Sequence, residues 1–432
     1  MNGSTVTLMD INKERLETIY RFAKKYSSEV KSNINFQKTM DRKEAIKDSD
    51  FVINVAMAGS HEYYEKMRAI SEKYGYFRGI NSVEWNMVSD YHTIWGYYQF
   101  KLAQDIAFDV EALSPDAWLL QVANPVLELT TLIGRTTKVK VIGLCDGYYT
   151  GRRDIAKALG LNEKEITFVA IGLNHDIWVT EFKKGNEDLY PLFREWIDKE
   201  YPSFYKTWYE EVKSNPLAVH VSPVMVDMYK TYGLIPVGDT VRNGTWKYHR
   251  DLETKKKWYG PLGGFDSPEG WKFYLDREKK EAEKIKNVVE DPNIRVSSLF
   301  PSEPIGLDPV VPVINAIAND KKSIIQVNVL NNGAIDGIPN DVAVEIPAVV
   351  DAKGVHIDKS YKLPTKILNF AIRPRIVRME WALEAFLEGG KEILFEWLVD
   401  DPRTKNDQQV EEVINALLSM EENKEMAKHF RG

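Results

Sequence analysis

Short apolar runs alternate with amphipathic stretches along the first third of the chain. The stretches 12–30 and 101–113 repeat their apolar residues at helical spacing, with Leu16, Ile19 and Ala23 on one face. The apolar runs that predict strands are residues 5–9, 51–55, 118–122 and 139–144. Strands that alternate with helices predict an α/β fold, in which helices cover a parallel sheet.

The pattern changes after the first third of the chain, where helical stretches become longer and strands fewer. Residues 190–208 predict a long helix, and residues 323–329 and 342–350 predict two antiparallel strands. A chain of 432 residues is also too long for one ordinary core. We therefore predict a Rossmann-type NAD-binding domain in residues 1–150. A mixed α+β domain in residues 151–432 would carry the substrate site and the contacts between subunits.

Composition places the chain among globular proteins and argues against several classes of function. Hydrophobic residues make up 44% and charged residues 28% of the sequence, and a net charge of −7 gives no electrostatic footprint for nucleic acid. No apolar run reaches about 18 residues and no signal peptide follows Met1, so neither a membrane span nor export is expected. The single cysteine is typical of a reducing compartment, and we expect a cytoplasmic protein.

Four residues follow the predicted parallel strands, at the sheet edge where ligands of such folds bind. They are Asp10, Val55, Ala56 and Asn124, and we predict that they bind a dinucleotide cofactor. An acid in the position of Asp10 hydrogen-bonds the ribose hydroxyls of NAD in Rossmann folds. The local sequence is equally compatible with an N-cap of the following helix, a role open to Asp10 and to Asn12.

The glycine-rich turn of a dinucleotide-binding domain is missing from this pattern. In such domains a first strand leads into a Gly-x-Gly-x-x-Gly turn, whose backbone N–H groups bind the pyrophosphate. Here residues 1–4 directly precede the run 5–9, which corresponds to a second strand. We therefore expect a sheet without its central strand and a cofactor site without its phosphate-binding floor.

Cys145 and His175 are the most informative residues of the chain. Cys145 is the only cysteine and follows the predicted strand 139–144, while His175 follows a second apolar run at 168–173. A thiolate and an imidazole at the ends of two strands can bind one divalent metal ion of soft to borderline character. A lone cysteine is more often a small buried apolar residue, so the pair alone leaves both interpretations open.

A series of short motifs runs through nearly the whole chain. The motifs are Val6-Thr-Leu-Met-Asp10, Phe51-Val-Ile-Asn54, Ala123-Asn-Pro-Val126, Gly143-Leu-Cys145, Gly172-Leu-Asn-His175, Asn331-Asn-Gly333 and Ile338-Pro-Asn-Asp341. Together and in this order they resemble glycoside hydrolase family 4, the NAD- and divalent-metal-dependent α-glycosidases. The resemblance implies a Rossmann domain related to those of lactate and malate dehydrogenases, followed by a mixed α+β domain.

The resemblance also implies the ligands and the chemistry of the site. In the family, the residues matching Cys145 and His175 bind the metal ion, usually Mn²⁺, and we expect Asn124 and Asn174 to contact the sugar. NAD⁺ takes a hydride from C3, a base removes the C2 proton, the aglycone leaves C1, water adds, and the hydride returns. The family is thus an exception to the two-carboxylate mechanism of ordinary glycosidases, and its metal acts as a Lewis acid. We also expect a homodimer or homotetramer whose substrate is a small sugar.

The proton donor and the base are less sharply indicated. In family members that are 6-phospho-α-glucosidases, the Asp matching Asp146 is the general acid, whereas many other members carry His there. A helix N-cap or a support for the metal site is the alternative for Asp146. Asp239 follows a turn and is the first candidate for the base, although it could instead cap that turn. Tyr232 and Tyr248 are the alternative bases.

The substrate is indicated by a cluster of basic residues. Arg242, Lys247 and His249 lie within eight residues, in a segment that resembles α-glucuronidases and α-galacturonidases of the family. An arginine fork binds a carboxylate or phosphate bidentately, so we predict that Arg242 grips the C6 carboxylate of a hexuronide. Asp146 favours a 6-phosphosugar instead, and a solvated basic loop is the structural alternative.

Two other classes of function remain. A 2-hydroxy-acid dehydrogenase would share the sheet, but it needs a His–Asp pair with a substrate-binding Arg and no metal-binding Cys. A binding protein without activity is the other, and the missing glycine turn is its best support. An α-glucosidase, an α-galactosidase or a 6-phospho-α-glucosidase is the alternative within the family.

Overall fold

The computed structural model describes residues 3–77, 96–242, 245–300 and 309–431. The strands are β1 (Thr5–Met9), β2 (Asn35–Thr39), β3 (Phe51–Asn54), β4 (Trp118–Gln121), β5 (Lys140–Gly143), β6 (Ile166–Leu173), β7 (Asp176–Lys184), β8 (Glu187–Asp188), β9 (Pro236–Val237), β10 (Ser323–Leu330), β11 (Ala343–Asp351) and β12 (Gly354–His356).

The α-helices are distributed between and after these strands. They are α1 (Lys13–Glu29), α2 (Arg42–Ile46), α3 (His61–Lys73), α5 (Tyr97–Leu113), α6 (Val126–Thr136), α7 (Gly147–Ala158), α8 (Tyr190–Lys199), α9 (Tyr201–Val212), α10 (Pro223–Tyr232), α11 (Leu252–Tyr259), α12 (Pro268–Glu290), α13 (Val296–Leu299), α14 (Val310–Ala318), α15 (Thr365–Ile367), α16 (Arg373–Glu388), α17 (Lys391–Val399), α18 (Asp407–Leu418) and α19 (Lys424–Arg431). Short 3-10 turns are η2 (Glu163–Glu165), η3 (Gly238–Arg242) and η5 (Glu421–Asn423), and η4 (Leu368–Ile372) is π-helical.

One large mixed sheet dominates the described part of the chain. Its ten strands follow the order β3-β4-β5-β10-β11-β6-β7-β8, with β12 paired to β11 and β9 paired to β7. β3, β4 and β5 are parallel, and β10 and β11 are antiparallel, as the sequence predicts. β5 meets β10 where Gly143 lies opposite Asn328. The predicted α/β fold is therefore confirmed, and strands from both halves of the chain share this sheet.

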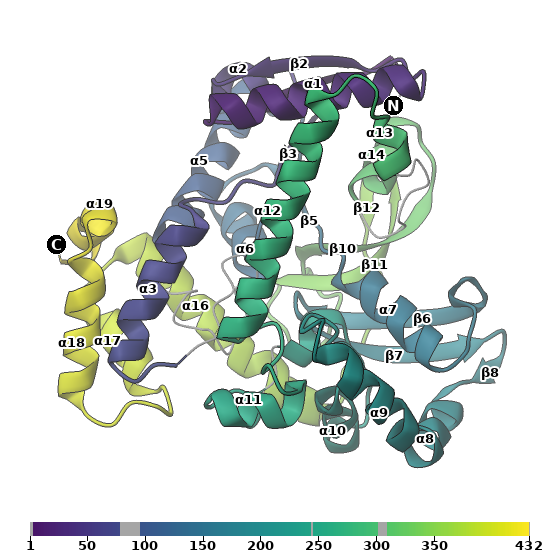
Figure 1. Ribbon diagram of the computed structural model, residues 1–432, viewed down its shortest axis with the longest axis vertical. Coiled ribbons are helices and arrows are strands. Elements are labelled where there is room, and N and C mark those ends of the chain that lie inside the picture. The colour runs from purple at the N-terminus through teal and green to yellow at the C-terminus, as the bar shows by residue number, and fades with distance from the viewer. Residues whose placement is uncertain (1–2, 78–95, 243–244, 301–308, 432) are drawn as a thin grey trace.

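The first two strands depart from the expected arrangement. β1 and β2 form a separate parallel pair, which Figure 1 shows at the top of the molecule with α1 and α2. The expectation that Asp10 shares a sheet edge with Asn124 and Cys145 is therefore wrong for this structure. The physical reason is that no strand among the described residues pairs with both the β1–β2 pair and β3, so no strand hydrogen bonds join the two sheets.

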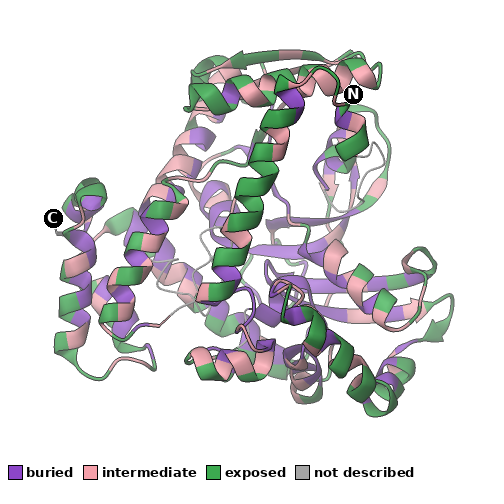
Figure 2. Cartoon of the chain, viewed as in Figure 1, coloured by how far each residue is buried: buried purple, intermediate pink, exposed green. Residues whose placement is uncertain are grey.

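Burial follows the sheet. In Figure 2 the central strands are buried, whereas α12 presents a long exposed face in front of them. Helix α12 begins at the N-cap Ser267 and buries side chains only near its two ends, because its middle is a run of charged residues. None of the helices in the described part of the chain is both long and apolar enough to cross a bilayer.

Candidate metal centre and active site

Cys145 and His175 meet at one edge of the large sheet. Cys145 follows β5, and His175 lies in the two-residue turn that joins β6 to β7. The Sγ atom of Cys145 is 3.7 Å from Nε2 of His175. His175 has a φ of 61°, a left-handed conformation that is costly for a residue with a side chain and that clusters at functional sites. The strand-end positions expected from the sequence thus bring both side chains together.

The separation of the two side chains fits shared coordination of one metal ion. Around a zinc ion, a sulfur at about 2.3 Å and a nitrogen at about 2.1 Å, separated by a tetrahedral angle, are about 3.6 Å apart. The 3.7 Å between Cys145 and His175 matches this value. Within the described residues no group of three or more His, Cys, Asp or Glu side chains is arranged to hold a metal. Two protein ligands suit an open catalytic site, whereas a structural zinc site closes its shell with four.

Asp239 is brought to this pair by a close backbone approach. It lies on η3, where Gly238 has a φ of 59°. A Cβ atom on Gly151 of α7 would lie 2.3 Å from the backbone N of Gly238, so only glycine allows this contact. The Oδ2 atom of Asp239 is 3.8 Å from Nε2 of His175. The structure therefore assembles three of the predicted site residues: Cys145, His175 and Asp239.

The environment of these groups alters their pKa values. Burial raises the pKa of the Cys145 thiol well above its ordinary value, and the negative charge of Glu345 adds to the effect. Burial and the positive charge of Arg375 lower the pKa of His175 to about 3. Burial also raises the pKa of Asp239 to about 7. At neutral pH the imidazole is thus neutral and ready to bind a metal, while the thiol must lose a proton to do so.

Glu345 is a site residue that sequence reasoning missed. It is buried on β11 and accepts a hydrogen bond from Nδ2 of Asn174 at 2.9 Å. The strand register aligns it with Asn328 on one side and Gly172 on the other, two residues before Asn174. Burial raises the pKa of Glu345 to about 7. The sequence feature that could have indicated Glu345 is its position as a lone acid within the apolar run of β11.

A narrow cavity joins these groups. It is lined by Cys145, Gly147, Tyr148, His175, Ile177, Val237, Asp239 and Glu345. Asp146 is exposed at the N-terminus of α7 and makes no side-chain capping bond, so its N-cap role is not seen. Tyr232 ends α10, packs edge-on against Trp178 and does not line the cavity. Tyr248 donates its hydroxyl proton to Asp227.

The basic residues of the predicted substrate cluster point to different places. Arg242 is 3% exposed, and its guanidinium binds carboxylates of the protein. Lys247 pairs with Asp227 at the surface, and His249 is buried against the hydroxyl of Tyr259. These three residues therefore do not form one cationic pocket, and the described structure does not support the solvated-loop alternative for Arg242.

Three of the residues predicted to bind a cofactor, Val55, Ala56 and Asn124, follow strands β3 and β4 of the large sheet, whereas Asp10 follows β1 of the separate pair. Val55 and Ala56 are exposed after β3, and the buried Oδ1 of Asn124 has no hydrogen-bond partner among the described residues. Such an unpaired acceptor fits a hydroxyl or amide of a bound ligand. Asp10 is bound by Arg15 at 2.7 Å. Burial opposes the shift, but hydrogen bonds from Arg15 and from the backbone N–H of Asn12 lower the pKa of Asp10.

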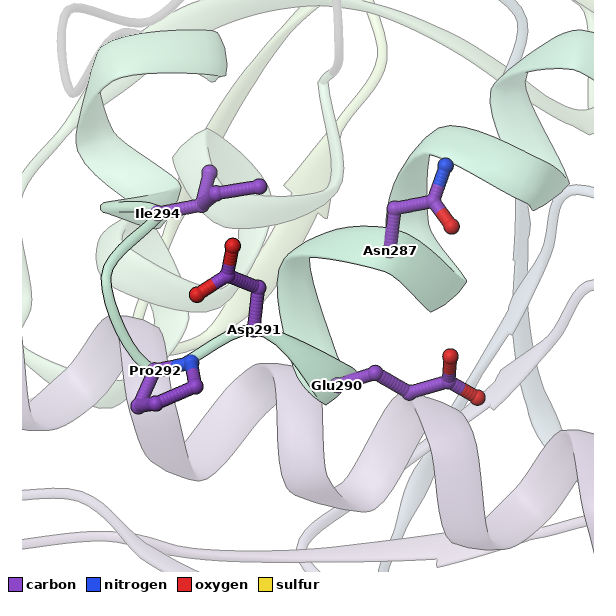
Figure 3. Close-up of a pocket in the computed structure, with 5 residues that line it drawn as sticks. All are labelled: Asn287, Glu290, Asp291, Pro292 and Ile294. Atoms are coloured by element: carbon purple, nitrogen blue, oxygen red, sulfur yellow. The ribbon is translucent and has the colours of Figure 1, made fainter.

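A second hollow lies away from these residues. It has a volume of about 590 Å³ and is open to solvent at the C-terminal end of α12, where the chain turns (Figure 3). Its lining is Asn287, Glu290, Asp291, Pro292 and Ile294. None of the predicted site residues contributes to it, so we assign it no role.

A thiol, an imidazole and a carboxyl group that share one cavity on an α/β sheet are the arrangement that suits an enzyme of the metal-dependent class. Comparison with known families supports this class. Residues 1–161 match the family 4 glycosyl hydrolase, and residues 170–404 match the family 4 glycosyl hydrolase C-terminal domain. The chain therefore belongs to family 4 of the glycoside hydrolases, and the resemblance stated from the motifs is confirmed.

Individual relatives extend over most of the chain at low identity. An α-galactosidase of Bacillus subtilis is 24% identical over 96% of this chain and 90% of its own length. An α-galacturonidase of Thermoanaerobacter italicus is 25% identical over 93% of this chain and 86% of its own. A 6-phospho-β-glucosidase of Thermotoga maritima, solved with manganese, NAD⁺ and glucose-6-phosphate, superimposes with a TM-score of 0.71 at 21% identity. This alignment covers 98% of this chain and 92% of that one, and it shows the common fold.

Proposed function

We propose that the protein hydrolyses α-linked hexuronides in a reaction that depends on NAD and a divalent metal, Mn²⁺ in the first instance. The observation that carries the proposal is the 3.7 Å approach of Cys145 to His175 beside Asp239 in one buried cavity. This arrangement provides a soft and a borderline ligand together with a carboxylate within reach of a bound sugar. It fits proton abstraction next to a carbonyl group better than it fits the two-carboxylate mechanism of ordinary glycosidases.

Cys145 and His175 are the residues that would hold the metal. When bound, NAD removes and returns a hydride, and the metal polarises the oxygens of the sugar. Asp239 takes the C2 proton, because its Oδ2 faces the cavity and burial raises its pKa to about 7, near the operating pH of a general base. Asp146, which is exposed between the cavity-lining residues Cys145 and Gly147, gives a proton to the departing aglycone.

Amides and strand ends complete the binding functions. Glu345 fixes Asn174 by accepting a hydrogen bond from its Nδ2 atom. The rest of the Asn174 carboxamide faces the hydroxyls of the sugar. The nicotinamide end of NAD lies over the carboxyl ends of β3 and β4, where the unpaired Oδ1 of Asn124 accepts a hydrogen bond. We further propose a cytoplasmic homodimer or homotetramer.

A hexuronide is favoured by the α-galacturonidase among the relatives and by the motif around Arg242. A neutral α-galactoside is the second candidate. It is favoured because the guanidinium of Arg242 binds carboxylates of the protein, donating from Nε and Nη2 to Asp266 and from Nη1 to Asp239. An α-galactosidase among the relatives agrees with this candidate.

The test is hydrolysis of p-nitrophenyl α-galacturonide, α-glucuronide, α-galactoside, α-glucoside and 6-phospho-α-glucoside, with NAD⁺, Mn²⁺ and a reductant present. We expect turnover without net NADH and the highest kcat/KM on an acidic sugar. In D₂O the product should acquire deuterium at C2, because the proton removed there exchanges with solvent. Retention of all protium at C2 over many turnovers would refute the mechanism. Preference for the phosphosugar would refute the proposal that the substrate is a hexuronide.

A further inference from the structure

Arg242 is the best-anchored charged side chain beside the cavity. Its Nε and Nη2 atoms donate to Oδ2 and Oδ1 of Asp266 at 3.0 and 2.9 Å, as a bidentate fork. Its Nη1 atom donates to Oδ1 of Asp239 at 2.8 Å. The guanidinium also lies 3.9 Å from the centre of the Phe265 ring. A planar cation held through all three of its nitrogen atoms and one face has a fixed orientation.

Asp266 anchors the arginine from a separate element. It is 4% exposed and directly precedes Ser267, the N-cap of α12. Its backbone carbonyl accepts a hydrogen bond from Nζ of the buried Lys255 at 2.5 Å. The Asp266 carboxylate therefore lies on backbone that is fixed by a helix start and by a second buried cation.

The bond from Arg242 decides which oxygen of Asp239 faces the cavity. Oδ1 accepts from Arg242 and lies 4.0 Å from Nε2 of His220, and neither of these two residues lines the cavity. Oδ2 lies 3.8 Å from Nε2 of His175, and it is the closest heavy atom to the Cβ position of Gly147. Without the arginine, rotation about the side-chain bonds of Asp239 would no longer be restricted to this orientation.

We propose that Arg242, anchored by Asp266, is a positioning residue that aims Oδ2 of Asp239 at the sugar, and that it does not bind the carboxylate of the substrate. The inference rests on the proposed function, in which Asp239 is the base at C2. It assigns Asp266 a part in the reaction, although Asp266 touches neither the cavity nor the sugar.

The test compares Arg242→Ala, Asp266→Asn and the double variant on an α-galacturonide and the matching neutral α-galactoside. Loss of one charge-assisted hydrogen bond corresponds to about ten- to hundredfold in rate. We expect kcat to fall by about this factor on both sugars, with KM and the affinity for Mn²⁺ little changed. The double variant should be no slower than Arg242→Ala, since Asp266 acts through Arg242. Lys247→Ala, a basic residue of the same segment that points to the surface, is the matched control and should retain full activity.

Two further readouts separate positioning from general damage to the fold. Guanidinium ion should restore part of the kcat of Arg242→Ala, and Arg242→Lys should not, because an ammonium group cannot hold two carboxylates as a fork does. Deuterium at C2 of the substrate should slow the variants more than the wild type, since the impaired step is proton removal. Asp266→Asn keeps the volume of the side chain, so it tests the same positioning role if Arg242→Ala does not fold.

The outcomes are distinguishable from those that test the proposed function. A wild type that turns over no sugar of the panel would overturn the proposed function and this role with it. An active wild type whose Arg242→Ala variant loses activity on the galacturonide alone would overturn the positioning role only and assign Arg242 to the substrate. Full activity of Asp266→Asn on both sugars would overturn the anchoring role.

Discussion

Metal binding is expected to release one proton from Cys145 and none from His175. Burial and nearby negative charge raise the pKa of the Cys145 thiol above its ordinary value of about 8.5, so the thiol is protonated at pH 8. His175 has a pKa of about 3 and is already neutral. Because a metal ligand must be a thiolate, binding exchanges one proton for the ion, and the affinity for Mn²⁺ should rise about tenfold per pH unit.

The neighbouring carboxyl groups can also release protons, so they affect the number of protons released per metal ion. Burial raises the pKa values of Asp239 and Glu345 to about 7, so at pH 8 both are mostly ionised and add little to the proton released by Cys145. Near pH 6 both are mostly protonated, and the cation can displace their protons as well, so the number released should increase toward about three.

Isothermal titration of Mn²⁺ in buffers of different ionisation enthalpy measures the protons released per ion. The expected values at pH 8 are about one for the wild type and close to zero for Cys145→Ser, whose hydroxyl does not ionise. His175→Gln is the matched control, because it should weaken binding but keep the proton release. Release of no proton by the wild type, or equal release by Cys145→Ser, would show that Cys145 is not a thiolate ligand.

Three further outcomes are expected. Asp239→Asn should lower kcat by about 10²- to 10⁴-fold, the usual contribution of a general base, and C2 proton exchange in D₂O should fall in parallel; unchanged exchange would exclude Asp239 as the base. Glu345→Ala should lower the free energy of unfolding in urea by about 1–3 kcal/mol, because it leaves the buried Nδ2 of Asn174 unpaired, whereas Glu345→Gln should cost less; equal losses would contradict this reason. Without metal, the melting temperature should fall as the pH rises from 5 to 7.5. The raised pKa values of Asp239 and Glu345 mean that their contribution is complete below the pKa of the unfolded chain and is lost as the pH approaches about 7. A flat profile would argue against buried, neutral carboxyls.

The parallel part of the fold could be predicted from the sequence because each of its strands is a short, mainly apolar run next to an amphipathic helix. The antiparallel pair β10–β11 could be predicted for a similar reason. The predicted single helix at 190–208 is wrong: α8 ends at Lys199 and α9 begins at Tyr201. Pro202 causes the break, because it lacks the N–H group that a continuous helix needs.

The site could be predicted where function follows from strand ends, and not where it depends on the path of the loops. Cys145 and His175 each end a recognisable strand, so their approach could be expected. Asp266 is 24 residues from Arg242 in the sequence, and only the fold of the intervening segment makes them partners. The expected role of Arg242 depended on its carboxylate partner, which local sequence does not specify. The only sequence signal for Glu345 is that it is a single charged residue inside an apolar strand.

The charges around the cavity explain why a cation suits it. The two buried arginines nearest to it are each matched by a carboxylate of their own. Arg242 forms the fork with Asp266, and Arg375 is paired with the fully buried Glu128. Buried ion pairs of this kind approximately neutralise themselves, so neither arginine has a full positive charge to spare.

Several acids lie around Cys145, and one of them, Asp239, accepts a hydrogen bond from Arg242. Asp239, Glu345 and Asp146 all raise the pKa of its thiol, and the first two are themselves shifted toward the neutral form by burial. Burying such groups is unfavourable unless they are neutralised, either by protons or by a cation. A divalent ion between Cys145 and His175 would favour the thiolate and both carboxylates together. The same ion would thus increase the fraction of Asp239 that is ionised near pH 7, which couples metal binding to the removal of the C2 proton.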